Sequence, residues 1–130
     1  MLDIRQVTED FAVAPQIAPE DMAVLREAGF TRIIANRPDG EEPGQPTLDA
    51  LRRAAEAEGL EFHAIPIRQP TPESVEATSS LLQQSDERTF AFCRSGTRSV
   101  TLWAMAMLQT GAMTREEALA AARKAGYSIA

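Results

Sequence analysis

The residues best suited to covalent chemistry lie together in the segment Cys93-Arg94-Ser95-Gly96-Thr97-Arg98-Ser99. Cys93 is the only cysteine of the chain, and it follows residues 88–92, an apolar run typical of a buried strand. The N–H groups of a loop that opens a helix have no partner inside the helix, so they stabilise an anion. Together with the charge of Arg94 and Arg98, they favour the thiolate, the nucleophilic form of cysteine. The segment therefore predicts a nucleophile in an anion-binding loop.

The other polar residues of this segment are expected to complete the contacts to the anion. Ser95, Thr97 and Ser99 carry hydroxyl groups, and Gly96 allows the backbone to approach a ligand closely. Of the two arginines, we interpret Arg94 as the one directed outward and Arg98 as the one that contacts the anion.

The spacing between Cys93 and Arg98 restricts which anion fits. Four residues separate them, one fewer than in cysteine-dependent phosphatases, whose loop encloses a tetrahedral phosphoryl group. One added sulfur atom needs a smaller ring of amides than a phosphoryl group does. The spacing therefore favours transfer of sulfur through a Cys93 persulfide over hydrolysis of a phosphomonoester through a cysteinyl phosphate.

A phosphatase also needs an acid that protonates the leaving oxygen. Asp39 is the first candidate for that acid, with Glu41 and Glu73 as alternatives. Asp39 also lies in a Pro-Asp-Gly sequence that is common in turns. Glu41 and Glu42 are expected to be solvated.

Strands and helices are expected to alternate around the Cys93 segment. Strands are predicted at residues 4–7, 11–14, 31–35, 60–67 and 88–92, and helices at 19–28, 48–58, 72–85, 100–108 and 115–125. Pro19 is expected at a first helical position, Thr47 as a helix cap, and Thr114 with Glu117 as a capping box.

This alternation predicts an α/β fold with a small, mainly parallel central sheet of about four or five strands and helices on both faces. The carboxyl ends of parallel strands meet at one edge of a sheet. Arg37 and Arg68, which each follow a predicted strand, are therefore candidates to line a crevice above Cys93 and to bind an anionic substrate.

The composition predicts a single globular domain over residues 1–130. Charged residues make up 25% of the chain and hydrophobic residues 44%, which are ordinary globular values. The net charge is −6, and no run of basic residues is longer than two, which argues against a nucleic-acid partner. An acidic surface with a basic pocket instead suits a small anionic substrate.

One cysteine and one histidine, His63, cannot form a disulfide or a zinc site of Cys and His ligands. We therefore expect no metal and no cofactor, and a cytoplasmic location. The chain shows no export signal at its start and no apolar run long enough for a membrane span. A membrane partner is not expected.

The Cys93 segment closely resembles the active-site loop of rhodanese-type sulfurtransferases, which cradles a cysteine persulfide. This resemblance implies that Cys93 accepts a sulfane sulfur and passes it to a thiol or a similar acceptor. The loop amides and Arg98 would stabilise the anionic sulfur.

Nearly the whole chain is similar to a second family, the phosphatase-like domain found alone or joined to β-lactamase-like hydrolases in bacteria. Residues 16–21, residues 36–46 and the pair Ile65-Pro66 carry this similarity. It implies the fold of dual-specificity phosphatases. The hydrolases in such fusions resemble persulfide dioxygenases of the metallo-β-lactamase fold, which implies sulfur metabolism and such a hydrolase as a partner.

The chain departs from the phosphatase pattern at two places. Phe92 stands where a histidine usually precedes the cysteine, and Arg68 and Gln69 stand where an aspartate commonly serves as the acid. The leading interpretation is therefore a cysteine-dependent sulfurtransferase acting on a small anionic or persulfide substrate. A cysteine-dependent phosphatase comes second, and a non-catalytic regulatory domain that binds an anion comes third.

Overall fold

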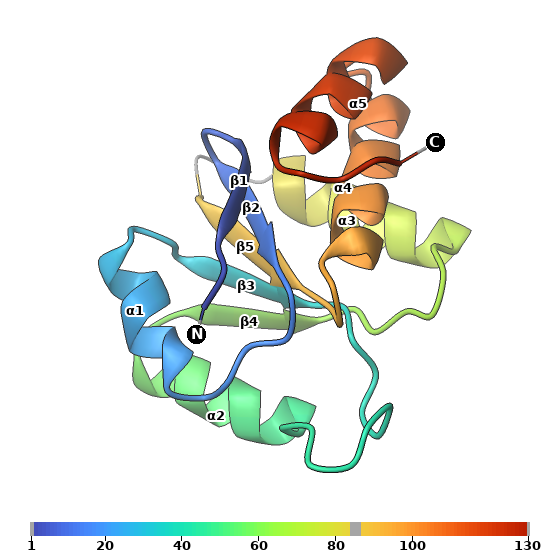
Figure 1. The fold of residues 1–130 in the computed structure, drawn as a ribbon. Helices are drawn as coiled ribbons and strands as arrows, with labels where there is room; N and C mark the ends of the chain where they lie inside the picture. Colours follow the sequence, from blue (N-terminus) through green and yellow to red (C-terminus); the bar gives the residue numbers. More distant parts are fainter. Residues whose placement is uncertain (1, 84–86, 130) are drawn as a thin grey trace.

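A five-stranded sheet forms the centre of the part of the chain that the computed structural model describes, residues 2–83 and 87–129 (Figure 1). Its strands run in the order β1-β2-β5-β3-β4. β1 pairs antiparallel with β2, and the other pairings are parallel. The strands are β1 (Arg5–Thr8), β2 (Phe11–Ala14), β3 (Arg32–Ala35), β4 (Glu61–Ala64) and β5 (Thr89–Phe92). The predicted mainly parallel sheet and its opening hairpin are confirmed.

Helices cover both faces of this sheet, as predicted (Figure 1). α1 (Asp21–Glu27) and α2 (Leu48–Ala57) lie on one face. α3 (Pro72–Gln83), α4 (Thr97–Thr110) and α5 (Arg115–Lys124) lie on the other. Among the described residues, no helix has both the length and the apolarity that crossing a bilayer requires.

β5 is buried on both faces and divides the core in two. Phe90 and Phe92 pack into the cluster beneath α1 and α2, whereas Ala91 between them joins the cluster beneath α4 and α5. This alternation follows from the two-residue period of a strand. On the second face, the Trp103 ring stacks on Phe11 with centroids 5.7 Å apart, so Trp103 is a core residue.

Several boundaries differ from those predicted. α4 begins at Thr97 rather than at residue 100, because Gly96 adopts a left-handed conformation and starts the helix early. α1 begins at Asp21 with Glu20 as its cap, so Pro19 precedes the helix. β4 ends at Ala64, although the N–H groups of Ile65 and Ile67 beyond it still donate to the carbonyls of Ala35 and Asn36. The predicted end of the third helix at Ser85 lies outside the described residues.

The predicted caps of α2 and α5 are confirmed. The Thr47 side chain accepts a hydrogen bond from the Ala50 N–H, and Thr114 and Glu117 form a complete capping box. The carboxyl ends of β3, β4 and β5 lie at one edge of the sheet, on the right of Figure 1. The loops that follow these strands therefore meet.

Replacing the central Phe90, which is fully buried, tests the two-sided core. Phe90→Ala should lower the free energy of unfolding by about 3–5 kcal/mol, since it removes a large apolar side chain and leaves a cavity. Met105→Ala is the control, because Met105 is 41% exposed and should change stability by less than about 0.5 kcal/mol. Urea unfolding measures both. Similar losses in the two variants would contradict this packing.

Candidate active site

Cys93 is the first residue after β5, and its side chain is fully buried. The Gly96 N–H donates a hydrogen bond to Cys93 Sγ at a distance of 3.0 Å. The Cys93 N–H in turn points to the Ala14 carbonyl, at 3.4 Å. A backbone donor aimed at sulfur stabilises the thiolate more than the thiol, because charge strengthens a hydrogen bond. The loop thus directs a backbone donor at Cys93 Sγ, and the role of Cys93 as a nucleophile stays a prediction.

Tyr127, which follows α5, fixes the conformation of this loop. Its hydroxyl donates to the Ser95 carbonyl at 3.0 Å. Gly96 has a φ of +96°, and a Cβ at this position would overlap the Tyr127 hydroxyl and ring. Only glycine fits both the backbone conformation and the space. Burial is the main reason that the pKa of Tyr127 is raised, so its hydroxyl stays a proton donor at neutral pH.

The three hydroxyl residues of the segment are placed differently from one another. Ser95 and Thr97 are exposed, and their hydroxyl groups lie 3.1 Å apart. Ser99 is buried, and its hydroxyl donates to Asn36 Oδ1 at 2.8 Å. Asn36 Nδ2 donates to the Ile65 carbonyl at 2.9 Å. Ser99 therefore ties α4 to the ends of β3 and β4, whereas the sequence suggested a contact to the anion.

Arg98 lies in the first turn of α4 and binds Glu41 with two nitrogens. Nη1 donates to Glu41 Oε2 at 2.9 Å, and Nη2 donates to Oε1 at 2.8 Å. Nη1 also donates to the Ile67 carbonyl at 2.9 Å. The pKa of Arg98 is raised chiefly by the hydrogen bonds to Glu41, which outweigh burial, and the charge of Cys93 acts in the same direction. Arg98 is thus held close enough to Cys93 to interact electrostatically with it.

Arg37 binds the same carboxylate, at the oxygen Oε1 that Arg98 also contacts. Its Nε donates to Glu41 Oε1 at 2.9 Å, and its other nitrogens reach Gln16 at 3.1 Å and Glu42 at 2.7 Å. Arg37 is only 3% exposed. Burial lowers its pKa, but the hydrogen bonds and charges of Glu41 and Glu42 outweigh that effect, so the pKa is raised. Arg37 therefore holds the loop between β3 and α2 in place.

Glu41 is ionised between these two arginines. The hydrogen bonds from Arg98, and then those from Arg37, outweigh burial and lower the pKa of Glu41 to about 2. Its side chain is 15% exposed, so the expectation that it is solvated is wrong. The expectation does describe Glu42, whose side chain is 52% exposed.

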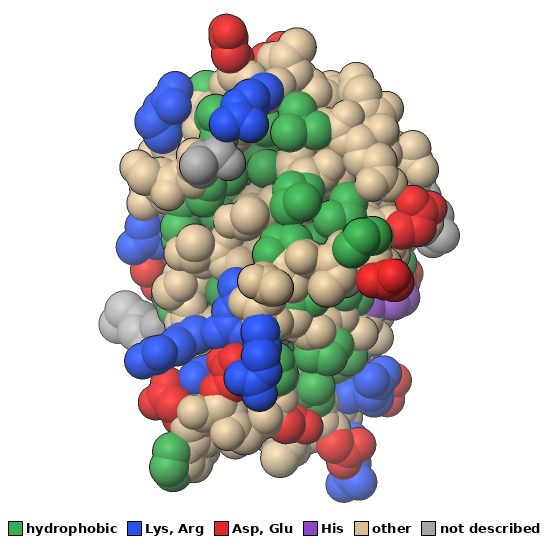
Figure 2. Space-filling model, turned by 90° about the vertical axis from the view of Figure 1, so that its right-hand side faces the viewer, with side chains coloured by type: hydrophobic (Ala, Val, Ile, Leu, Met, Phe, Trp, Pro, Cys, Tyr) green, Lys and Arg blue, Asp and Glu red, His purple; other side chains and the backbone are tan. Residues whose placement is uncertain are grey.

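The candidate arginines meet at one open cavity of about 330 Å³. We call it the arginine cavity; its lining residues are Arg37, Gly40, Glu41, Arg68, Arg94 and Arg98. Figure 2 looks onto this edge of the molecule, where basic and acidic side chains gather in the lower half. Four guanidinium groups outnumber the carboxylates of Glu41 in the lining and of Glu42, which pairs with Arg37 and Arg94. The cavity therefore keeps a positive charge, which attracts an anion.

The arginines of the cavity are not equally available to a ligand. The Arg94 side chain is 69% exposed, with Nε 3.4 Å from Glu42 Oε1, so it points outward as predicted. Arg68 is exposed and makes no hydrogen bond or ion pair to any residue that the structure describes. Arg68 and Arg94 therefore offer the donors that an incoming anion meets first.

Asp39, the leading candidate for a general acid, is directed to a helix terminus. Its Oδ1 accepts a hydrogen bond from the Leu48 N–H at 2.8 Å, at the start of α2. Asp39 is not among the described residues that line the arginine cavity. Because Oδ1 accepts this hydrogen bond, a proton donated by Asp39 would have to be carried by Oδ2.

The residues that sequence reasoning missed are those that position the others. Asn36 directly follows a predicted buried strand, and this position could have marked it as a residue of the site. Gln16 and Tyr127 carry no such signal, because their partners are distant in sequence. The sequence around Glu41 gave no sign that both Arg37 and Arg98 would bind its carboxylate.

Comparison with known proteins decides the family. Residues 3–112 match the model of the phosphatase-like domain of beta-lactamase hydrolase-like proteins. The chain belongs to this family. A beta-lactamase hydrolase-like protein of Agrobacterium fabrum is 33% identical over 114 residues, which are 86% of this chain. One of Xylella fastidiosa strain Temecula1 is 29% identical over 130 residues, 98% of the chain. The chain spans only 26% and 30% of the lengths of these two relatives.

Solved structures show that this chain shares the fold of cysteine phosphatases. A Neisseria meningitidis Z2491 protein provisionally named a phosphatase is 31% identical, with a TM-score of 0.82 over 96% of this chain and 89% of its own. Tk-PTP in its active form is 19% identical, with a TM-score of 0.73 over 97% and 86% of the two chains. Kinase-associated phosphatase, in a form whose catalytic cysteine is replaced by serine, is 16% identical, with a TM-score of 0.74 over 95% and 82%. The predicted fold is confirmed.

Alanine at Gly96 should destabilise the protein more than alanine at Gly111. Both glycines have positive φ, +96° and +74°, but only Gly96 faces Tyr127, whereas Gly111 faces open space. Gly111→Ala should cost about 1–2 kcal/mol from backbone strain alone, and Gly96→Ala should cost more. In a Tyr127→Ala background the cost of Gly96→Ala should fall, as a urea-unfolding double-mutant cycle would show. Equal costs at the two glycines would contradict the packing of Tyr127 on the loop.

The ionised state of Glu41 predicts a particular acid sensitivity. Its pKa falls from an ordinary 4.5 to about 2 on folding, so its charge stabilises the fold above pH 4.5, and this contribution is lost as the pH falls toward 2. Urea unfolding between pH 7 and pH 2 should therefore show a shallower acid loss in Glu41→Gln than in the wild type.

Glu42→Gln is the matched control for Glu41→Gln. The pKa of Glu42 is also lowered, chiefly by its hydrogen bond from Arg37, but half of its side chain is exposed, so solvent screens the charge. It should change the acid profile less than Glu41→Gln. Identical profiles for the wild type and Glu41→Gln would contradict the bridging role of Glu41.

Proposed function

We propose that this domain is a cysteine-dependent phosphatase that hydrolyses phosphomonoesters through a cysteinyl phosphate on Cys93. The observation that carries the proposal is the Gly96 N–H on Cys93 Sγ, in a loop whose Arg94 and Arg98 line a cavity rich in arginine. The family and the fold of the solved structures similar to this chain also support phosphatase chemistry. Phosphatase chemistry thus moves ahead of sulfur transfer, which the loop spacing, the missing acid and the hydrolase fusions of similar domains favoured.

The reaction would proceed in two displacements at phosphorus. The Cys93 thiolate attacks the phosphorus atom, an S–P bond forms, and the P–O bond to the leaving group breaks with its electron pair on the oxygen. Water then attacks phosphorus, the S–P bond breaks, and inorganic phosphate and the thiolate are released. The Gly96 N–H stabilises the thiolate before and after, and the guanidinium groups neutralise the charge of the phosphoryl oxygens.

The cavity favours substrates with a good leaving group. Glu41 is the carboxylate that lines the cavity, and a pKa of about 2 leaves it without a proton to donate at neutral pH. Asp39 is bound to the Leu48 N–H, and Glu73 lies in the neighbouring groove. Without acid assistance, departure of the leaving oxygen depends on its own basicity. Aryl phosphates are therefore the expected substrate class, ahead of alkyl phosphates.

Sulfur transfer is the second candidate, and two observations favour it. Four residues separate Cys93 and Arg98, and sulfur transfer needs no acid. The Cys93 thiolate would attack the outer sulfur of thiosulfate, the S–S bond would break, and sulfite would leave; an acceptor thiolate would then remove the sulfur from Cys93. A metallo-β-lactamase-fold hydrolase that consumes persulfide stays a predicted partner under this hypothesis.

A series of substituted phenyl phosphates tests the phosphatase proposal. The kcat/KM of the wild type, which reports the step that forms the cysteinyl phosphate, should fall steeply as the pKa of the leaving phenol rises, because no acid offsets its basicity. Cys93→Ser should abolish turnover. A shallow dependence would contradict the absence of acid assistance and point to Asp39 or Glu73. Glu73→Gln then identifies which of them acts.

Thiosulfate with cyanide as acceptor is assayed in parallel. Thiocyanate formation without any phosphatase turnover would replace the proposal with sulfur transfer. No turnover in either assay, with anion binding retained in Cys93→Ser, would leave the non-catalytic anion-binding domain.

A further inference from the structure

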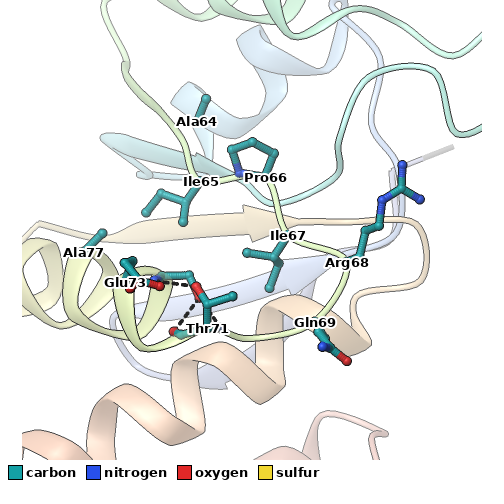
Figure 3. A pocket seen from close by; sticks show the side chains of 10 residues that line it. Ala64, Ile65, Pro66, Ile67, Arg68, Gln69, Thr71, Glu73 and Ala77 are labelled. Atoms are coloured by element: carbon teal, nitrogen blue, oxygen red, sulfur yellow. Dashed lines mark hydrogen bonds between the residues drawn. The ribbon is translucent and has the colours of Figure 1, made fainter.

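A groove of about 470 Å³ lies beside the arginine cavity, between the segment that follows β4 and the start of α3 (Figure 3). Apolar side chains form most of its wall, among them Ile65, Pro66 and Ile67 from the segment and Ala77 from α3. In Figure 3, Ile65 and Ile67 point toward the start of α3. Its volume lies within the range of about 300–1,000 Å³ that is typical of small-molecule sites. We call it the apolar groove.

The hydroxyl groups of Thr71 and Ser74, in the wall of the apolar groove, take part in the cap of α3. The Thr71 N–H donates to Ser74 Oγ at 2.8 Å, and the Ser74 N–H donates to Thr71 Oγ1 at 3.0 Å. Ser74 Oγ also donates to the Thr71 carbonyl at 2.9 Å. These contacts cap α3 and leave, of the two hydroxyl groups, only the Thr71 O–H without an acceptor among the described residues. The groove therefore offers an apolar surface rather than a second polar site.

Arg68 joins the two cavities, because it lines both of them. Its side chain extends away from α3 in Figure 3. A ligand whose anionic group lies among the arginines can thus continue past Arg68 into the groove. Glu73, which also lines the groove, disfavours a second anionic group there.

We propose that the apolar groove binds an uncharged, apolar part of the substrate while its anionic group lies at the Cys93 loop. The substrates would then be phosphomonoesters of a hydrophobic alcohol or phenol, rather than sugar phosphates or nucleotides. This inference rests on the proposed function for the identity of the anionic group. The binding of the apolar part does not depend on turnover.

Alkylphosphonates of increasing length test the groove, because their C–P bond is not hydrolysed. Methyl-, butyl- and hexylphosphonate are titrated into the wild-type protein by calorimetry. Each methylene that enters the groove should tighten binding about fourfold, from roughly 0.8 kcal/mol per buried methylene. Equal affinities for methyl- and hexylphosphonate, or binding of none of them, would overturn the proposal.

Ala77→Trp should block the groove, since Ala77 is an exposed wall residue on α3. It should remove the dependence on chain length and leave methylphosphonate affinity unchanged. Ala57→Trp, at an exposed position on α2 across the sheet, is the matched control and should keep the dependence. An unchanged dependence in Ala77→Trp would overturn the proposal.

The two proposals fail separately. If chain length strengthens binding but no phenyl phosphate is turned over, the phosphatase proposal fails and the groove stands. If phenyl phosphates are turned over but chain length has no effect on phosphonate binding, the groove fails and the phosphatase proposal stands.

Discussion

The carboxylate of Glu41 lies between the guanidinium groups of Arg37 and Arg98, and this contact joins the loop after β3 to the first turn of α4. Two poorly hydrated cations this close together need a shared anion, because an unpaired buried charge is costly. Glu41 supplies that anion and so fixes the direction of Arg98. The same contact removes Glu41 from proton transfer. One interaction therefore positions the anion-binding arginine and determines which leaving groups the site can expel.

Segments that are far apart in sequence hold the Cys93 loop in place around this bridge. Asn36 connects the end of β3 to Ser99 and to the Ile65 carbonyl. Tyr127 reaches the Ser95 carbonyl from beyond α5. The parallel sheet makes this convergence possible, since it brings the ends of β3, β4 and β5 to one edge. The nucleophile is thus held by the whole fold, although the chemistry is confined to a few residues.

The sequence predicted the elements better than it predicted the partners of polar side chains. Alternating strands and helices, the Thr47 and Thr114 caps and the buried run before Cys93 depend on local patterns, and the structure confirms them. The start of α4 was missed because the helix begins directly after a left-handed Gly96, within the polar segment that the sequence pattern assigned to a loop. Glu41 was misjudged because one of its two partners, Arg98, lies 57 residues away, a distance that no local pattern records.

The loop spacing and the fold favour different functions for Cys93, so the order of the functional hypotheses depends on which of them is given more weight. Its spacing to Arg98 favours a small sulfur anion, whereas the fold, the family and four arginines at one cavity favour a phosphoryl group. Intact-mass analysis after rapid acid quenching distinguishes the two chemistries by the group that Cys93 Sγ gains. With a phenyl phosphate, wild-type protein but not Cys93→Ser should gain the mass of one phosphoryl group, mapped to Cys93 by peptide analysis. A gain of one sulfur atom from thiosulfate with no phosphoryl gain from any phenyl phosphate would contradict the account.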